Sequence, residues 1–203
     1  MTSVSNFLTS NWAQYSKMAT LLWDATLQTL YMVGASSAIS IAIGVPLGVL
    51  LLVTSKGYFF ENLAFYRVLG TVVNALRSIP FIILMVAISP LTKMIVGSSI
   101  GTTAVIVPLV VGTIPFTGRL VETSLRTVPQ GLIQNFTITV IVIIGCSAMA
   151  GAIGGGGLGD VAIRYGYMRF RLDMMIGTVV ILILMVQIVQ FLGDYLTRKV
   201  DHR

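Results

Sequence analysis

Charged side chains are scarce in this chain of 203 residues. Only 10% of the residues are Asp, Glu, Lys or Arg, whereas 56% are hydrophobic. Soluble domains carry about a quarter charged residues, because a charged surface must face water. A chain with so few charges cannot cover itself in water. The composition therefore excludes an ordinary soluble domain and predicts a protein dissolved in a lipid bilayer.

Acidic residues are the rarest charged type. Seven Asp and Glu stand against 13 Lys and Arg, which gives a net charge of +6. The basic residues do not cluster but lie at the ends of apolar stretches, as in loops that contact lipid headgroups. This distribution argues against nucleic-acid binding. Only Asp24 and Glu122 among the acids lie near an apolar stretch, which argues against a proton-coupled carrier.

Cysteine and histidine occur once each. Cys146 lies inside an apolar run and cannot form an internal disulfide, so we interpret it as a small packing residue. His202 is the last residue but one and is interpreted as a solvated tail group, so we expect no metal site. Residues 1–14 are polar and uncharged and so form no basic n-region before an apolar core, and we expect no cleaved signal peptide.

Motifs for nucleotide chemistry are missing or misleading. The pattern G-x-x-x-x-G-K-[ST] occurs nowhere, and no catalytic triad or carboxylate pair is visible, so we expect no enzyme and no bound cofactor. Residues 154–159 match G-x-G-x-x-G by letter. That fingerprint requires a strand before it and a helix after it, whereas here it follows an apolar span. We interpret it as a flexible turn that closes the fourth helix.

Long charge-free runs are abundant: residues 25–55, 78–92, 94–118, 127–159 and 174–193. About 20 helical residues cross a hydrocarbon layer of about 30 Å. Four runs are long enough, and the second becomes so if Arg77 and Lys93 extend their charges to the two interfaces. We predict an all-α integral membrane protein, one domain over 1–203, with five helices near 26–53, 71–92, 102–121, 133–153 and 174–197.

Five spans place the two termini on opposite sides of the membrane. With a cytoplasmic C-terminus, the inner side carries eight Lys and Arg and the outer side five. The positive-inside rule favours this orientation, which leaves the N-terminus outside. The segment from Asp160 to Asp173 opposes the rule, because its three arginines then face outward.

Proline and small residues occur inside the spans. The prolines, which remove a backbone donor and favour kinks, are Pro46, Pro80, Pro108 and Pro115. Between residues 34 and 48, Gly, Ala and Ser give the first helix a small-residue face that permits close helix contact. Two interpretations stay open: plain packing of the bundle, or mobile, kinked helices that line a path.

Several motifs resemble one family of membrane proteins, the permease subunits of methionine-type ABC importers. The resemblance implies the type I importer architecture of five transmembrane helices in a bacterial inner membrane, and a subunit that pairs with itself around a path. It also implies two cytoplasmic ATPase subunits that use ATP and Mg²⁺, an outer substrate-binding lipoprotein, and D- or L-methionine as substrate. The motifs lie at Asn74–Phe81, Ile106–Leu109, Pro115–Phe116, Arg119–Glu122, Gly145–Gly151, Gly157–Asp160, Arg164–Tyr167 and Gln190–Asp194.

The connection between the third and fourth spans departs from the family. Permeases of this type carry there a cytoplasmic loop with an E-A-A-x-x-x-G pattern, whose short helices dock into the ATPase. Here Glu122 is followed by Thr-Ser, and its nearest downstream glycine, Gly131, is nine residues away. Two short helices and a turn need about 20 residues, whereas residues 122–134 number 13 and include Pro129.

The docking loop is therefore predicted to be missing. Glu122, Arg126, Pro129 and Gly131 mark the truncated coupling region. Because relatives have similar Gly-Leu-Ile segments on both flanks of the loop, we hypothesise an internal deletion that joined them at residues 131–133. The alternative is a minimal docking turn over residues 125–134. Three functions stay open: a methionine importer subunit, a coupling-deficient or nonfunctional variant of one, and a stand-alone carrier or channel.

The resemblance also implies site residues. Ser147, Met149 and Gly151 match its translocation-path segment; a Met at a constriction offers an adaptable apolar gate, and core packing is the alternative. We expect Arg77 to anchor the inner end of the second helix. The candidates for docking an acidic face of the binding protein, with headgroup contact as the alternative, are Arg164, Tyr165, Arg169 and Arg171.

Overall fold

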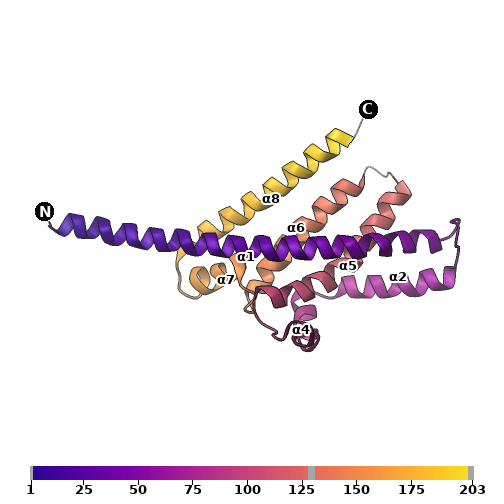
Figure 1. Cartoon of the computed structure of the whole chain (residues 1–203), viewed down its shortest axis with the longest axis horizontal. Helices are drawn as coiled ribbons and strands as arrows, with labels where there is room; N and C mark the ends of the chain where they lie inside the picture. Colours follow the sequence, from indigo (N-terminus) through magenta and orange to yellow (C-terminus); the bar gives the residue numbers. More distant parts are fainter. Residues whose placement is uncertain (1, 128–130, 201–203) are drawn as a thin grey trace.

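The computed structural model describes residues 2–127 and 131–200, and in this part of the chain every regular element is a helix. The first, α1 (Thr2–Thr54), is continuous over 53 residues and forms the long axis of the molecule (Figure 1). At 1.5 Å per residue it is about 80 Å long, so it extends well beyond a bilayer core of about 30 Å. Pro46 lies inside α1 without ending it.

The second span is broken. The helices α2 (Leu63–Ser78) and α3 (Phe81–Ala87) meet at a bend of 102°, so the single helix expected near 71–92 is not formed. The cause is local: Pro80 has no N–H to continue α2, and its ring disfavours helical dihedrals at the preceding residue. Ile79 accordingly adopts an extended conformation with φ −77° and ψ 123°. A short helix, α4 (Ser89–Val96), follows α3.

The remaining spans are single helices: α5 (Thr102–Thr127), α6 (Gly131–Gly151) and α8 (Leu172–Val200). The short α7 (Gly157–Val161) and the π-helix η1 (Ala162–Tyr167) connect α6 to α8. Among the described residues, four helices are long and apolar enough to cross a membrane, and five spans result when α2 and α3 count as one broken span. The predicted all-helical membrane architecture is confirmed.

The small-residue face of α1 packs against α5, the helix with which α1 shares its most extensive interface (Figure 1). A Cβ added at Gly48 would lie 2.6 Å from the carbonyl oxygen of Gly118, so only glycine permits this approach. The hydroxyls of Ser40 and Thr113 share a buried hydrogen bond of 2.6 Å across the same interface. The small residues therefore serve tight packing, the first of the two interpretations.

The glycine-rich segment forms a turn tied to α1. Gly154, Gly156 and Gly157 have φ of 87°, 75° and 72°, a region that only glycine adopts readily. The N–H of Gly157 donates to Oε1 of Gln28, and the N–H of Leu158 donates to Oγ1 of Thr29, both at 2.9 Å. The match to a dinucleotide fingerprint is thus a false one, because this turn follows a helix and is occupied by contacts to α1.

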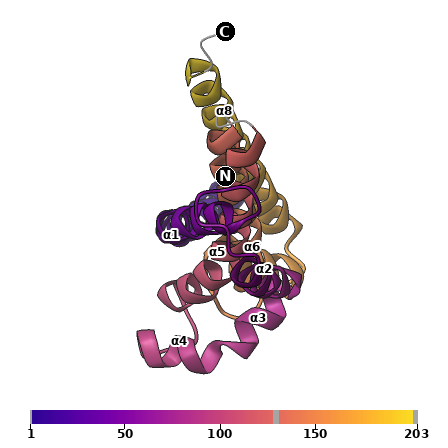
Figure 2. The same cartoon turned by 90° about the vertical axis from the view of Figure 1, so that its right-hand side faces the viewer.

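The last helix leaves the bundle. Figure 1 shows α8 diverging from α1 toward the C-terminus, and only 11% of its apolar window is buried. Large apolar side chains such as Ile183, Leu184 and Phe191 are more than half exposed. Figure 2 shows α3 and α4 projecting from the opposite side of the bundle. Apolar surface of this extent is typical of a protein that lipid or another subunit covers.

Candidate functional site

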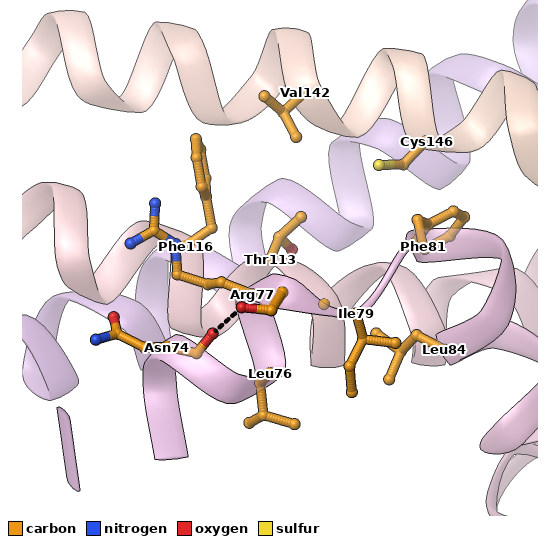
Figure 3. Close-up of a pocket in the computed structure, with 12 residues that line it drawn as sticks. Asn74, Leu76, Arg77, Ile79, Phe81, Leu84, Thr113, Phe116, Val142 and Cys146 are labelled. Carbon is orange, nitrogen blue, oxygen red and sulfur yellow. Dashed lines mark hydrogen bonds between the residues drawn. The ribbon is translucent and has the colours of Figure 1, made fainter. Parts of the chain in front are cut away.

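A cavity of about 510 Å³ opens where α2 breaks. Helices α2, α3, α5 and α6 all contribute to it, so three parts of the chain distant in sequence (74–84, 112–116 and 142–146) converge at one place (Figure 3). Polar groups come from α2 and α5, and apolar groups come from α3 and α6. The side chains that define its character are Asn74, Arg77, Phe81, Thr113, Phe116, Val142 and Cys146.

The cavity lies about halfway through the bundle. Tyr66 near the start of α2 bonds to Glu122 near the end of α5, so these two helix ends share one side of the membrane. Arg77 is 14 residues beyond Leu63, and Thr113 is 14 residues before Thr127. At 1.5 Å per residue both lie about 21 Å from that side. Because a hydrocarbon core is about 30 Å thick, we expect the cavity to lie at membrane depth.

This depth corrects the role expected for Arg77. The sequence placed Arg77 at the inner end of the second helix, and this is wrong, because α2 begins at Leu63 and Arg77 lies in its last turn. Its guanidinium lies over the ring of Phe116, 5.6 Å from the centroid. Within the described part of the chain it takes part in none of the ion pairs. Arg77 is therefore an intramembrane cation without a carboxylate partner.

The two arginines of α5, in contrast, are paired. Glu122, only 2% exposed, accepts hydrogen bonds from Arg119 at 2.5 Å and from Arg126 at 2.8 Å. Arg119 also donates to Oδ1 of Asn74 at 3.2 Å, which connects α5 to α2. Glu122 and Arg126 were predicted as remnants of a coupling region. In the structure they belong to an ion-pair network within the subunit.

The residues predicted to form a truncated coupling region belong to α5 and α6 where the structure describes them. The amide of Asn135 on α6 donates to the carbonyl of Leu120 at 3.0 Å and to the hydroxyl of Ser124, both on α5. Gly131 is the first residue of α6, and a Cβ there would lie 3.2 Å from the Ser124 hydroxyl. Pro129 lies outside the described residues. Only residues 128–130 separate the two helices.

The predicted translocation-path residues do not line the cavity. Ser147 is 1% exposed and donates to the carbonyl of Ile144 at 2.7 Å. Gly151 packs against the backbone of α7, because a Cβ there would lie 2.2 Å from the N of Asp160. Met149 is 51% exposed on the surface. Their neighbour Cys146 faces the cavity instead (Figure 3).

Sequence reasoning missed this site, although one signal for it was present. Pro80 interrupts a span three residues after Arg77, and unwound helices at mid-depth are typical of binding sites in membrane transporters. Phe116, Val142 and Cys146 carried no such signal. Which face of α5 or α6 points toward α2 depends on tertiary packing.

The residues predicted to dock a binding protein gather at the opposite end of the bundle, around η1. Arg164 pairs with Asp160 at 2.8 Å, and the guanidinium of Arg169 lies 4.8 Å from the ring centroid of Tyr165. Arg171 is fully engaged: its hydrogen bond to Asp173 raises its pKa above the ordinary value. The structure brings Tyr165 and Arg171 together at a second cavity but ties Arg164 to Asp160 of the preceding α7.

The fold is similar to that of a solved ABC transporter. The chain matches one described as "Inward facing conformations of the MetNI methionine ABC transporter" with a TM-score of 0.90 and 39% identity, over 92% of this chain and 99% of that chain. A five-span bundle of this fold is a membrane-spanning subunit of an ABC transporter. The chain matches no protein-family profile.

Curated relatives are more specific. The "Probable D-methionine transport system permease protein MetI" of Vibrio cholerae is 50% identical over 90% of this chain and 93% of that protein. The "Methionine import system permease protein MetP" of Bacillus subtilis is 39% identical over 91% of this chain and 95% of its own length. The chain belongs to the family of methionine ABC transporter permeases.

Both relatives are longer than this chain within the matched region. The Vibrio alignment runs over 210 positions, and the matched 90% of 203 residues fills about 183 of them, so about 27 positions have no counterpart here. The Bacillus alignment runs over 211 positions, of which the matched 91% fills about 185, which leaves about 26. The number of unmatched positions is similar for relatives from two different bacteria, which indicates that this chain lacks residues that both relatives have.

Proposed function

We propose that the chain is the membrane-spanning subunit of an ATP-driven methionine importer, and that it lacks the segment through which such a subunit engages its ATPase. Two copies enclose the path, two cytoplasmic ATPase subunits bind ATP and Mg²⁺, and an outer lipoprotein delivers D- or L-methionine. The chain itself binds no cofactor. The Vibrio and Bacillus relatives, both described as methionine transport permeases, support the substrate, and the match to the MetNI structure supports the transporter class.

The proposal of a missing docking segment rests on the short connection between α5 and α6. All five spans of the fold are present among the described residues, which supports a shortfall of about 27 residues in a connection between spans. Residues 128–130 are all that separate Thr127 from Gly131, whereas two docking helices and a turn need about 20 residues. The adjoining residues belong to α5 and α6, which argues against the minimal docking turn over 125–134.

Loss of this segment affects coupling more than insertion. A nucleotide-driven change reaches the permease only through contacts that differ between its states, and the ends of α5 and α6 bond to each other and to α2 instead. We therefore infer a stable pore half that engages its ATPase weakly. Its N-terminus lies outside and its C-terminus in the cytoplasm, so a green fluorescent protein fused after Arg203 is expected to fluoresce. A dark fusion of normal abundance would contradict this orientation.

Methionine uptake tests the function. The host is a methionine-requiring bacterium without its own importer that expresses the ATPase and binding lipoprotein of the Vibrio system. The native chain is compared with a variant that receives the absent segment of the Vibrio relative between Gln130 and Gly131. A scrambled segment of equal length is the matched control.

Of the three chains, we expect only the one with the restored segment to support ATP-dependent uptake of labelled methionine. Uptake by the native chain at the restored level would refute the coupling defect. Failure of the restored chain, at normal membrane abundance, would refute the importer assignment. Methionine flux through the native chain in proteoliposomes without partners would favour a stand-alone carrier instead.

A further inference from the structure

The guanidinium of Arg77 faces the cavity without a carboxylate partner among the described residues. A charged side chain inside a membrane is costly and usually faces a partner or a polar cavity. Arg119 and Arg126 satisfy this rule through Glu122. Within the described residues Arg77 has no carboxylate partner, is exposed, and faces the cavity with only the ring of Phe116 beside it (Figure 3). The cavity thus offers an anion a guanidinium that no described Asp or Glu pairs with.

The same cavity also offers negative potential, from the end of α2. The last turn of a helix leaves carbonyl groups without N–H partners, and the helix dipole places about half a negative charge there. Pro80 cannot donate to the carbonyl of Leu76, which accepts from Ile79 instead at 3.4 Å. Because Leu76, Ser78 and Ile79 all line the cavity, the end of the helix faces the same space as the Arg77 guanidinium.

The remaining wall is apolar. Phe81 and Leu84 on α3 and Val142 and Cys146 on α6 face the polar end across the cavity (Figure 3). No Asp or Glu lines it, so a cationic side chain would meet only Arg77. A volume of about 510 Å³ falls within the range of about 300–1,000 Å³ that small-molecule sites occupy.

We propose that this cavity binds the transported amino acid, with its carboxylate on Arg77, its ammonium at the carbonyl end of α2, and its side chain between Phe81 and Val142. This site rests on the proposed function and defines the substrate class of the path as zwitterions with an apolar side chain. A thioether fits this wall, since sulfur packs favourably against aromatic rings. Lysine and arginine are excluded because no carboxylate faces them.

Cys146 provides a native reporter for the test. It is the only cysteine in the chain and lines the cavity, so a bound ligand slows its alkylation. The rate with N-ethylmaleimide is measured for the full chain, and for the chain with the restored Vibrio segment, in lipid nanodiscs. The ligands are L-methionine, L-norleucine, L-lysine, and L-methioninol, which has an alcohol in place of the carboxylate.

We expect methionine and norleucine to protect Cys146, and methioninol and lysine not to. R77Q is expected to raise the methionine concentration for half-protection at least about tenfold, because a hydrogen bond between charged groups is lost. R77K retains a charge and keeps part of the protection. R67Q removes an exposed arginine that lies ten residues earlier on α2 and away from the cavity. We expect this variant to keep the full protection of Cys146.

The proposed binding site and the proposed importer function can be refuted independently. Equal protection by methioninol, or full protection in a folded R77Q chain, would overturn the role of Arg77. A restored chain that imports methionine without protecting Cys146 would overturn the site and leave the function intact. A restored chain that protects Cys146 without importing would support the site and overturn the function.

Discussion

Tyr66 on α2 donates a hydrogen bond of 3.0 Å to Glu122 on α5, and this contact joins the broken span to the rest of the bundle. Glu122 is nearly inaccessible and holds two arginines as well, so a buried carboxylate organises charges that would otherwise repel each other. The same network fixes α2 at Tyr66 and Asn74, and the last turn of this helix carries Arg77 to the cavity.

Removing the carboxylate charge is therefore expected to destabilise the protein. E122Q leaves Arg119 and Arg126 without a counterion and is predicted to lower the free energy of unfolding by about 1–3 kcal/mol. Y66F removes one hydrogen bond to the same carboxylate and is predicted to cost about 1 kcal/mol. Thermal unfolding in detergent ranks the variants. An E122Q chain as stable as the native chain would show that the network contributes no stability.

The close contact between α1 and α5 gives a second prediction. G48V introduces atoms where a Cβ alone would lie 2.6 Å from the Gly118 carbonyl oxygen, so we expect a loss of about 1–3 kcal/mol from overpacking. G34A is the matched control on the same helix, because a Cβ at Gly34 meets nothing within 4 Å. The detergent melting temperature should fall for G48V and stay or rise for G34A. A G48V chain that melts no lower than the native chain would show that the close contact with Gly118 does not limit side-chain size here.

The link between α1 and the glycine turn gives a third prediction. T29V keeps the side-chain shape but leaves the buried N–H of Leu158 without its acceptor, at a cost of about 1–3 kcal/mol. We expect faster amide hydrogen exchange across residues 154–160, followed by mass spectrometry. T20V is the control, since Thr20 on α1 is exposed and its hydroxyl bonds only to its own helix. Unchanged exchange in T29V would show that other contacts hold the turn.

Much of this fold is predictable from the lengths of charge-free runs. The thickness of the hydrocarbon layer sets the length of a span, so α5, α6 and α8 appear within a few residues of the expected ranges. The broken span was harder to predict. Pro46, Pro108 and Pro115 stay inside continuous helices, whereas Pro80 ends one, and the packing of neighbouring helices decides between these results.

The position of Arg77 along α2 was predicted wrongly for a related reason. Residues 63–70 include Arg67, so this segment was assigned to a loop and Arg77 was placed at an interface. In the structure Arg67 is on the exposed side near the beginning of α2, where a charge is tolerated. Charge alone therefore misplaced the start of α2, and with it the depth of the cavity.

The absent segment between α5 and α6 is tested most directly by co-purification with the ATPase. The tagged native chain and the chain with the restored Vibrio segment are expressed with the Vibrio ATPase, extracted in mild detergent and captured in equal amounts. We predict that the restored chain retains the ATPase at one copy per permease and that the native chain retains little or none. Stoichiometric capture by the native chain would contradict the proposal that its docking segment is missing.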